Sequence, residues 1–146
     1  MLAGEKINLY LERIETLIGE ISSLREATLS EHNTCVNNNS IDSEYYAPSD
    51  TLKAQVANLY CMVRLKSELL NRVSNFLSIW KMDPQHKPED IEEINVILRD
   101  FATESENDMS FVREIKDMSN FSGDIKVVIY DNDGVALETI ELSGDF

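Results

Sequence analysis

Carboxylates are the most numerous ionisable side chains of this chain, and seven of the 27 form two short runs. The first run is Glu89, Asp90, Glu92 and Glu93, and the second is Glu104, Glu106 and Asp108. Paired carboxylates catalyse acid–base reactions when an apolar cleft pushes their pKa values apart. Acids at the start of a helix more often form a solvated face that complements the helix dipole. We therefore predict that these runs face solvent or a protein partner.

His32 and Cys35 are three positions apart and could form half of a metal site. Zinc needs three or four protein ligands, and the remaining candidates are His86, between two prolines, and Cys61, within an apolar helical pattern. An incidental loop pair is the favoured interpretation, and the same scarcity argues against a Cys–His nucleophile. The five glycines are too scattered for a phosphate-binding loop. We predict no catalytic residue, no metal and no cofactor, and hence no enzyme.

The segment 131–134, Asp-Asn-Asp-Gly, invites a calcium-loop interpretation. In the helix–loop–helix calcium motif the first ligand lies five residues before the glycine, and that position is the apolar Ile129. Strand-forming residues precede and follow the segment, and an Asp-Gly pair readily adopts the positive φ of a hairpin turn. We predict a β-hairpin over about 125–142.

The strongest helical signal runs from Ser49 to Trp80. Apolar residues recur there at steps of three and four, and a second line of apolar residues lies beside the first. The apolar face is therefore wide enough to need more than one neighbouring helix to bury it. The first line is Leu52, Val56, Leu59, Val63, Leu70, Val73, Leu77 and Trp80, and the second is Met62, Leu69 and Phe76. Lys66 interrupts the first line. Tyr60, Phe76 and Trp80 could line a ligand groove, although packing in the core is favoured.

The other helices are less sharply bounded. Over about 5–29, a heptad seam predicts a helix that packs either on the central helix or, in a dimer, on the same helix of a second chain. Gly19 lies within this helix and marks either a close helix crossing or nothing. The seam consists of Ile7, Leu11, Ile14, Ile18 and Ile21. Pro88 suits a helix start, and the apolar pattern falters over 103–108 before it resumes. We predict two helices with a restart at Asn107 or Asp108, with one kinked helix as the alternative.

Residues 30–48 are polar and lack periodicity, which predicts a loop that ends at an N-cap, Ser49 or Asp50. Tyr45 and Tyr46 could anchor it. The predicted fold is mainly α: a bundle of three to five helices around a long central helix (about 49–80). We expect a single domain over 1–146, with the polar loop 30–48 and a C-terminal hairpin over 124–143.

The net charge is −14, and it is unevenly distributed. Residues 49–82 hold five basic and two acidic residues, whereas residues 83–117 hold four basic and eleven acidic residues. Such a field repels nucleic acid and membrane phosphates and speeds encounter with a basic surface. No apolar run approaches the roughly 20 residues that span a bilayer, and the charged opening segment is unlike a signal peptide. We expect a cytoplasmic protein.

These features favour a non-catalytic inhibitor that caps a basic surface on a nucleic-acid-handling protein. Bacterial immunity proteins, antitoxins and phage-encoded inhibitors share this acidic composition. The predicted partner-binding residues are Glu89, Asp90, Glu92, Glu93, Glu104, Glu106 and Asp108, with Tyr45 and Tyr46 as aromatic anchors. The alternatives are a homodimeric structural or adaptor subunit and a small chaperone for a secreted or phage protein.

Overall fold

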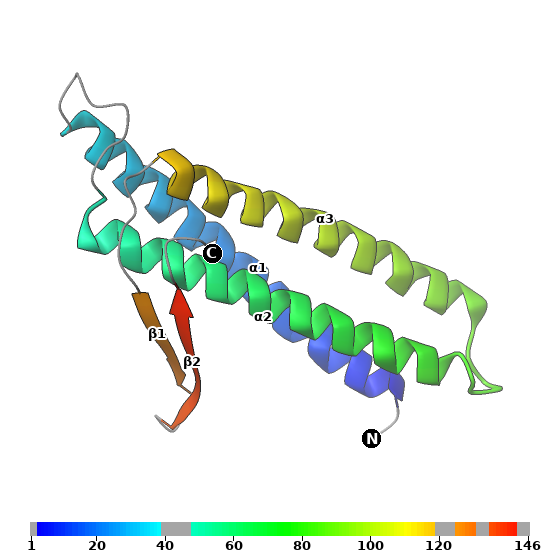
Figure 1. The fold of residues 1–146 in the computed structure, drawn as a ribbon. Coiled ribbons are helices and arrows are strands. Elements are labelled where there is room, and N and C mark those ends of the chain that lie inside the picture. The colour runs from blue at the N-terminus through cyan, green and yellow to red at the C-terminus, as the bar shows by residue number, and fades with distance from the viewer. Residues whose placement is uncertain (1–2, 39–47, 119–124, 131–134, 143–146) are drawn as a thin grey trace. The chain divides into compact units, whose positions relative to one another are not determined.

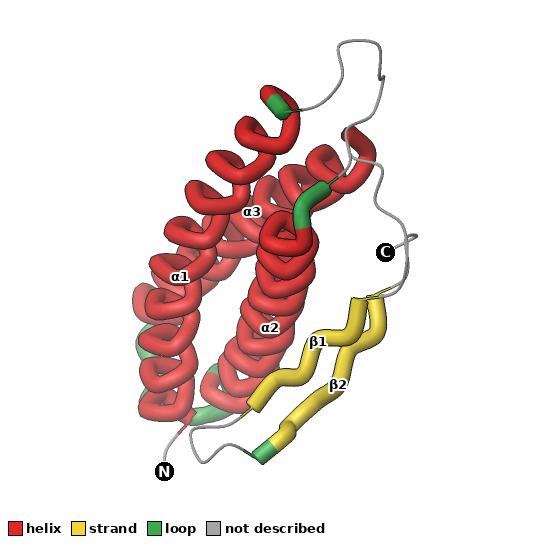
Figure 2. Tube along the Cα trace, turned by 90° about the vertical axis from the view of Figure 1, so that its left-hand side faces the viewer, coloured by secondary structure: helices red, strands yellow, loops and turns green. Residues whose placement is uncertain are grey.

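Three long helices make up most of the computed structural model, which describes residues 3–38, 48–118, 125–130 and 135–142 (Figure 1). The helices are α1 (Ala3–Asn37), α2 (Asp50–Trp80) and α3 (Pro88–Met118). Two strands follow, β1 (Ile125–Tyr130) and β2 (Ala136–Leu142), coloured yellow in Figure 2. The predicted mainly helical bundle is therefore confirmed, with three helices. Within the described residues, none of the helices combines the length and apolar character that a membrane span requires.

The chain divides into two compact units, and each helix contributes to both. Unit 1 comprises residues 1–22 and 62–109, and unit 2 comprises residues 23–61 and 110–146. The helices of unit 1 alternate in direction. Gly4 and Lys6 of α1 lie near Trp80 and Phe76 of α2, and Lys66 of α2 meets Glu104 of α3, so each helix runs antiparallel to the next along the chain.

The core of unit 1 forms where the apolar lines predicted from the sequence meet. Its buried members are Ile7, Ile14, Leu69, Leu70, Val73, Leu77, Ile91 and Ile94. Leu11 and Ile18 of the heptad seam pack against this cluster, as do Phe76 and Trp80. Ile7, Ile14 and Ile21 of the seam are thus buried within the chain, while Leu11 and Ile18 are half-buried.

In unit 2 all three helices again bury side chains. The fully or nearly fully buried members are Thr28, His32, Cys35, Leu52, Val56, Ala57, Leu59, Cys61, Val112 and Ile115. The Ser49 hydroxyl donates to Glu31 Oε1 at 2.7 Å and accepts from the Leu52 backbone N–H at 3.1 Å. The second bond makes Ser49 the N-cap of α2, one of the two predicted residues.

α1 continues to Asn37, so the predicted loop boundary at residue 30 is wrong by about two turns. The polar residues there do not break the helix because their hydroxyls bond within it: Thr34 Oγ1 donates to the Ser30 carbonyl at 3.1 Å. His32 and Cys35, one turn apart, are both buried and also hold this turn in place. Residues 39–47 of the predicted loop, which include Tyr45 and Tyr46, lie outside the described residues.

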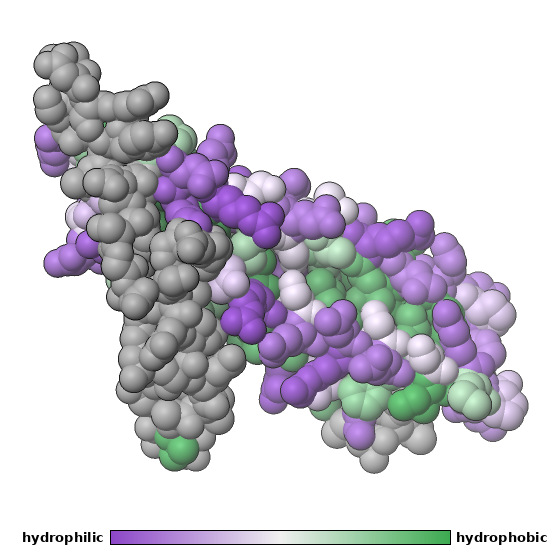
Figure 3. Space-filling view, viewed as in Figure 1, coloured by the Kyte–Doolittle hydropathy of each residue, from purple (hydrophilic) through white to green (hydrophobic). Residues whose placement is uncertain are grey.

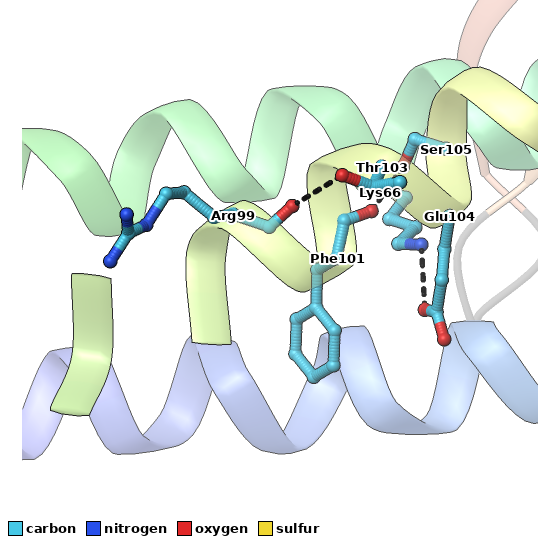
Figure 4. A network of polar contacts seen from close by, with 6 residues as sticks. All are labelled: Lys66, Arg99, Phe101, Thr103, Glu104 and Ser105. Atoms are coloured by element: carbon cyan, nitrogen blue, oxygen red, sulfur yellow. Dashed lines mark hydrogen bonds and ion pairs between the residues drawn. The ribbon is translucent and has the colours of Figure 1, made fainter. Parts of the chain in front are cut away.

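α3 is one helix, and the predicted restart at Asn107 or Asp108 does not occur. Thr103 Oγ1 donates to the Arg99 carbonyl and Ser105 Oγ to the Phe101 carbonyl, both at 3.0 Å (Figure 4). Each hydroxyl therefore finds its acceptor one turn back in the same helix. Ser105 is also buried, so this polar stretch still presents an inward face.

β1 pairs antiparallel with β2, from Ile125 opposite Leu142 to Tyr130 opposite Ala136. The register shifts by one residue between Ile129 and Tyr130. Residues 131–134, for which the sequence suggested a turn rather than a calcium loop, lie outside the described residues.

Candidate functional site

The predicted acidic residues share one helix but not one surface. Glu89, Glu92, Glu93, Glu104 and Glu106 are exposed, whereas Asp90 and Asp108 are half-buried. Of the predicted acids, Glu92 forms an ion pair with Arg99 and Glu104 forms one with Lys66. Because α3 is continuous, its geometry sorts the acids onto separate faces.

One face of α3 carries a row of carboxylates that we call the acidic stripe: Glu89, Glu93, Asp100 and Glu104. At 3.6 residues per turn these four positions fall within a narrow arc, on the side next to the buried Ile94 and Val112 face. Val96 lies in the same row and is exposed. Sequence reasoning missed Asp100 because it sits outside both acidic runs, and only helical spacing could have revealed it.

Among the described residues, Lys66 forms an ion pair with a member of the acidic stripe. Its Nζ lies 3.4 Å from Glu104 Oε2, and the two side chains are 1% and 52% exposed (Figure 4). The same ammonium group lies 5.7 Å from the centre of the Phe101 ring. Glu104 therefore compensates a buried charge, while the described residues provide no ion pair for Glu89, Glu93 or Asp100.

A hollow of about 550 Å³ opens beside the stripe in unit 1, and we call it the Trp80 hollow. All three helices line it. Its apolar lining is Trp80, Leu11, Ile94 and Ile97, and its polar lining includes Glu5, Asn8, Asp83, Asp90 and Glu93. Two of the predicted acids, Asp90 and Glu93, are thus brought together with carboxylates from outside the predicted runs.

Asp83 reaches the hollow through the turn that follows α2. Its backbone N–H donates to the Trp80 carbonyl at 2.9 Å, and its Oδ1 accepts the Gln85 N–H at 2.9 Å. These two bonds fix the backbone turn and the Asp83 side chain, which lines the hollow together with Trp80. Sequence reasoning missed Asp83, although its position three residues after the tryptophan was a usable signal.

Glu92 faces another way. It lies 3.6 Å from Arg99, with both side chains 71% exposed, so the pair contributes little to stability. Both residues line a second hollow of about 510 Å³, to which Ser74 of α2 also contributes. In unit 1, Figure 3 shows hydrophilic surface along α3 and a strip of hydrophobic surface between it and α2.

His32 and Cys35 lie on α1 in unit 2 rather than in a loop. Burial lowers the pKa of His32 from its ordinary 6.5, and the Glu114 carboxylate partly opposes this. Cys35 Sγ lies 3.9 Å from Glu31 Oε1, and Cys35 and Cys61 are both buried and outside any disulfide. Within the described ranges, no three His, Cys, Asp or Glu side chains are placed so that they could hold a metal ion.

Comparisons with known proteins found no matching family model, no matching curated protein and no matching solved structure.

Proposed function

We propose that this chain is a non-catalytic protein-binding domain that covers a basic surface of a nucleic-acid-handling protein with the acidic stripe of α3. The observation that carries the proposal is the stripe itself: Glu89, Glu93 and Asp100 are exposed on one helix face with no ion pair among the described residues. Clustered charge of one sign steers a partner of the opposite sign and fixes its orientation.

A nucleic-acid-handling partner follows from the sign and the layout of the charge. Proteins that hold a phosphate backbone present rows of lysine and arginine, and an extended row of carboxylates competes for such a track. The exposed Val96 within the row adds apolar contact. In biological terms this is the behaviour of an inhibitor of the immunity-protein, antitoxin or phage type.

The adaptor alternative assigned homodimerisation to the α1 seam or to the hairpin. Ile7, Ile14 and Ile21 of that seam are buried by the chain's own helices, so no described feature favours a dimer through it.

The test begins with capture of partners on the immobilised protein at about 50 mM and about 500 mM NaCl, since salt screens exposed charges. An identified partner is then measured by surface plasmon resonance against the double variant Glu93→Lys with Asp100→Lys. We expect association to slow by about tenfold or more, with a smaller change in dissociation.

The matched control is Glu20→Lys with Glu106→Lys, which changes the net charge equally at exposed positions away from the stripe. If association slows equally in both double variants, the effect is due to net charge and not to the position of the acidic stripe. Salt-independent capture, or capture of partners without a basic surface, would refute the proposal.

A further inference from the structure

We infer that the Trp80 hollow receives an arginine side chain of the protein partner. This inference rests on the proposed function and specifies how the partner is held once the acidic stripe has attracted it. The hollow of about 550 Å³ lies within the range of roughly 300–1,000 Å³ typical of ligand pockets. It therefore has room for a complete long side chain together with its adjoining backbone.

The lining of the hollow matches a side chain that is apolar along its stem and cationic at its tip. Ile94 and Ile97 supply apolar surface, while Asp83, Asp90 and Glu93 supply carboxylates. Arginine and lysine both bury their methylene stems and keep the charged group at a polar edge. A neutral or anionic ligand would leave these acids without a counter-charge.

The ring of Trp80 provides a second and independent observation. Unit 1 has four aromatic rings among its described residues, and three of them lie near a cation of the chain. Lys6 lies 5.1 Å from the centre of Phe76, Arg13 lies 6.0 Å from Tyr10, and Lys66 lies 5.7 Å from Phe101. Trp80 has no such neighbour in the described part of the chain, although tryptophan is the aromatic residue that binds cations best.

Arginine fits this arrangement better than lysine. Its planar guanidinium stacks on an aromatic face and directs several N–H donors at carboxylates in the same plane. An ammonium group can neither stack nor donate as a fork. The wall formed by Trp80 with carboxylates beside it therefore favours the guanidinium.

The arginine belongs to a protein rather than to a free polycation because the hollow is continuous with the stripe. Glu93 is a member of both. A basic segment of the partner that lies along α3 can therefore place one side chain at the mouth of the hollow while its neighbours stay in contact with the acidic stripe.

Trp80 is the only tryptophan of the chain, so its fluorescence reports occupancy directly. The probe is the peptide acetyl-Gly-Arg-Gly-amide, compared with the same peptide carrying citrulline, which keeps the shape but loses the charge. We expect a saturable change of Trp80 emission with the arginine peptide and none with citrulline. Replacing Glu93 with Gln should weaken binding about threefold to tenfold, as expected for a charge-assisted hydrogen bond at a partly solvated site.

Glu106→Gln is the matched control because it removes the same charge from an exposed position outside the hollow. A second variant, Gly4→Leu, fills the hollow from α1. A Cβ at Gly4 would lie 3.6 Å from the Trp80 ring, an ordinary contact, so the fold accommodates the first carbon while the rest of the side chain takes the space. This variant should abolish the response.

The inference is overturned by no saturable response to the arginine peptide, by an equal response to the citrulline peptide, or by equal weakening in Glu93→Gln and Glu106→Gln. Tighter binding of spermidine than of the peptide would make the occupant a free polycation and would also overturn it. Failure here is distinct from failure of the proposed function. If only the inference fails, the double variant Glu93→Lys with Asp100→Lys would still slow association with the partner, while Trp80 emission would not respond to the arginine peptide.

Discussion

Gly19 lies inside α1, and beyond the helix's own backbone no heavy atom comes within 4 Å of the position that its Cβ would occupy. The close helix crossing considered from the sequence is therefore absent at this residue. Since glycine costs a helix interior conformational entropy, Gly19→Ala should raise the free energy of unfolding by about 0.5–1 kcal/mol. Urea denaturation followed by circular dichroism measures this. A lower stability in the variant would mean that another chain packs against Gly19.

Lys66 is buried in the apolar line of α2, and Glu104 is its counter-charge. Glu104→Gln leaves a buried ammonium with weaker compensation and should lower the free energy of unfolding by about 1–3 kcal/mol. Lys66→Met removes the charge and keeps an unbranched apolar stem, so it should be neutral or stabilising. Urea denaturation of both single variants and the double variant gives the coupling energy. Equal destabilisation by the two single changes would show that Lys66 stabilises the fold itself.

His32 links the stability of unit 2 to pH. Its pKa in the folded chain is lowered by burial, so the unfolded chain binds the proton more readily. The stability that neutral His32 contributes is fully present above its unfolded pKa of about 6.5 and is lost as pH falls through the lower folded pKa. His32→Gln should therefore flatten the decline of the urea midpoint below pH 6.5. His86→Gln serves as the control, and an unchanged pH profile in His32→Gln would contradict the prediction.

At the scale of the helices, the heptad seam of α1 defines which face is buried. Ile14 is 0% exposed within the core of unit 1, whereas Leu9 on the same helix is 48% exposed. Ile14→Ala should lower the free energy of unfolding by about 2–5 kcal/mol, because it loses apolar burial and leaves a cavity. Leu9→Ala should change it by about 0.5 kcal/mol or less. Similar losses at both positions, measured by urea denaturation, would place a partner on the Leu9 face.

The sequence was sufficient for the helices wherever apolar spacing is regular. The extent of α2 follows from that pattern, while the start signals Ser49 or Asp50 and Pro88 predicted where α2 and α3 begin. It was insufficient at 30–37 and 103–108, where polar composition was interpreted as a helix break. There the hydroxyls of Thr34, Thr103 and Ser105 bond to carbonyls one turn back, an arrangement that composition does not distinguish from a loop.

The candidate site was predictable only in part, because composition shows neither helical phase nor contacts between distant residues. Exposed acids of α3 were identified from charge density, but their division between the acidic stripe and the Trp80 hollow depends on helical phase. Glu104 illustrates the limit, because its pairing with the buried Lys66 joins residues 38 positions apart. Asp83 and Glu5 reach the hollow from two other segments of the chain, and no local pattern joins them to Asp90.

At the scale of the whole molecule, each unit contains its own spectroscopic or chemical reporter. Trp80 belongs to unit 1, and the buried thiols of Cys35 and Cys61 belong to unit 2. Because all three helices pass from one unit into the other without a break, we expect both units to unfold together. Trp80 emission and thiol accessibility to a maleimide should give the same urea midpoint. Separate midpoints would show that the helices can fray across the boundary.

The unbroken course of α3 also sets a length. A helix rises 1.5 Å per residue, so Glu89 and Glu104 stand about 22 Å apart along its axis. Nucleotides of one strand of a duplex follow one another every 3.4 Å, so this span corresponds to about six or seven of them. A target whose cationic track accommodates a nucleic acid backbone of that extent can meet every carboxylate of the row, whereas a small isolated basic patch reaches only one end of it.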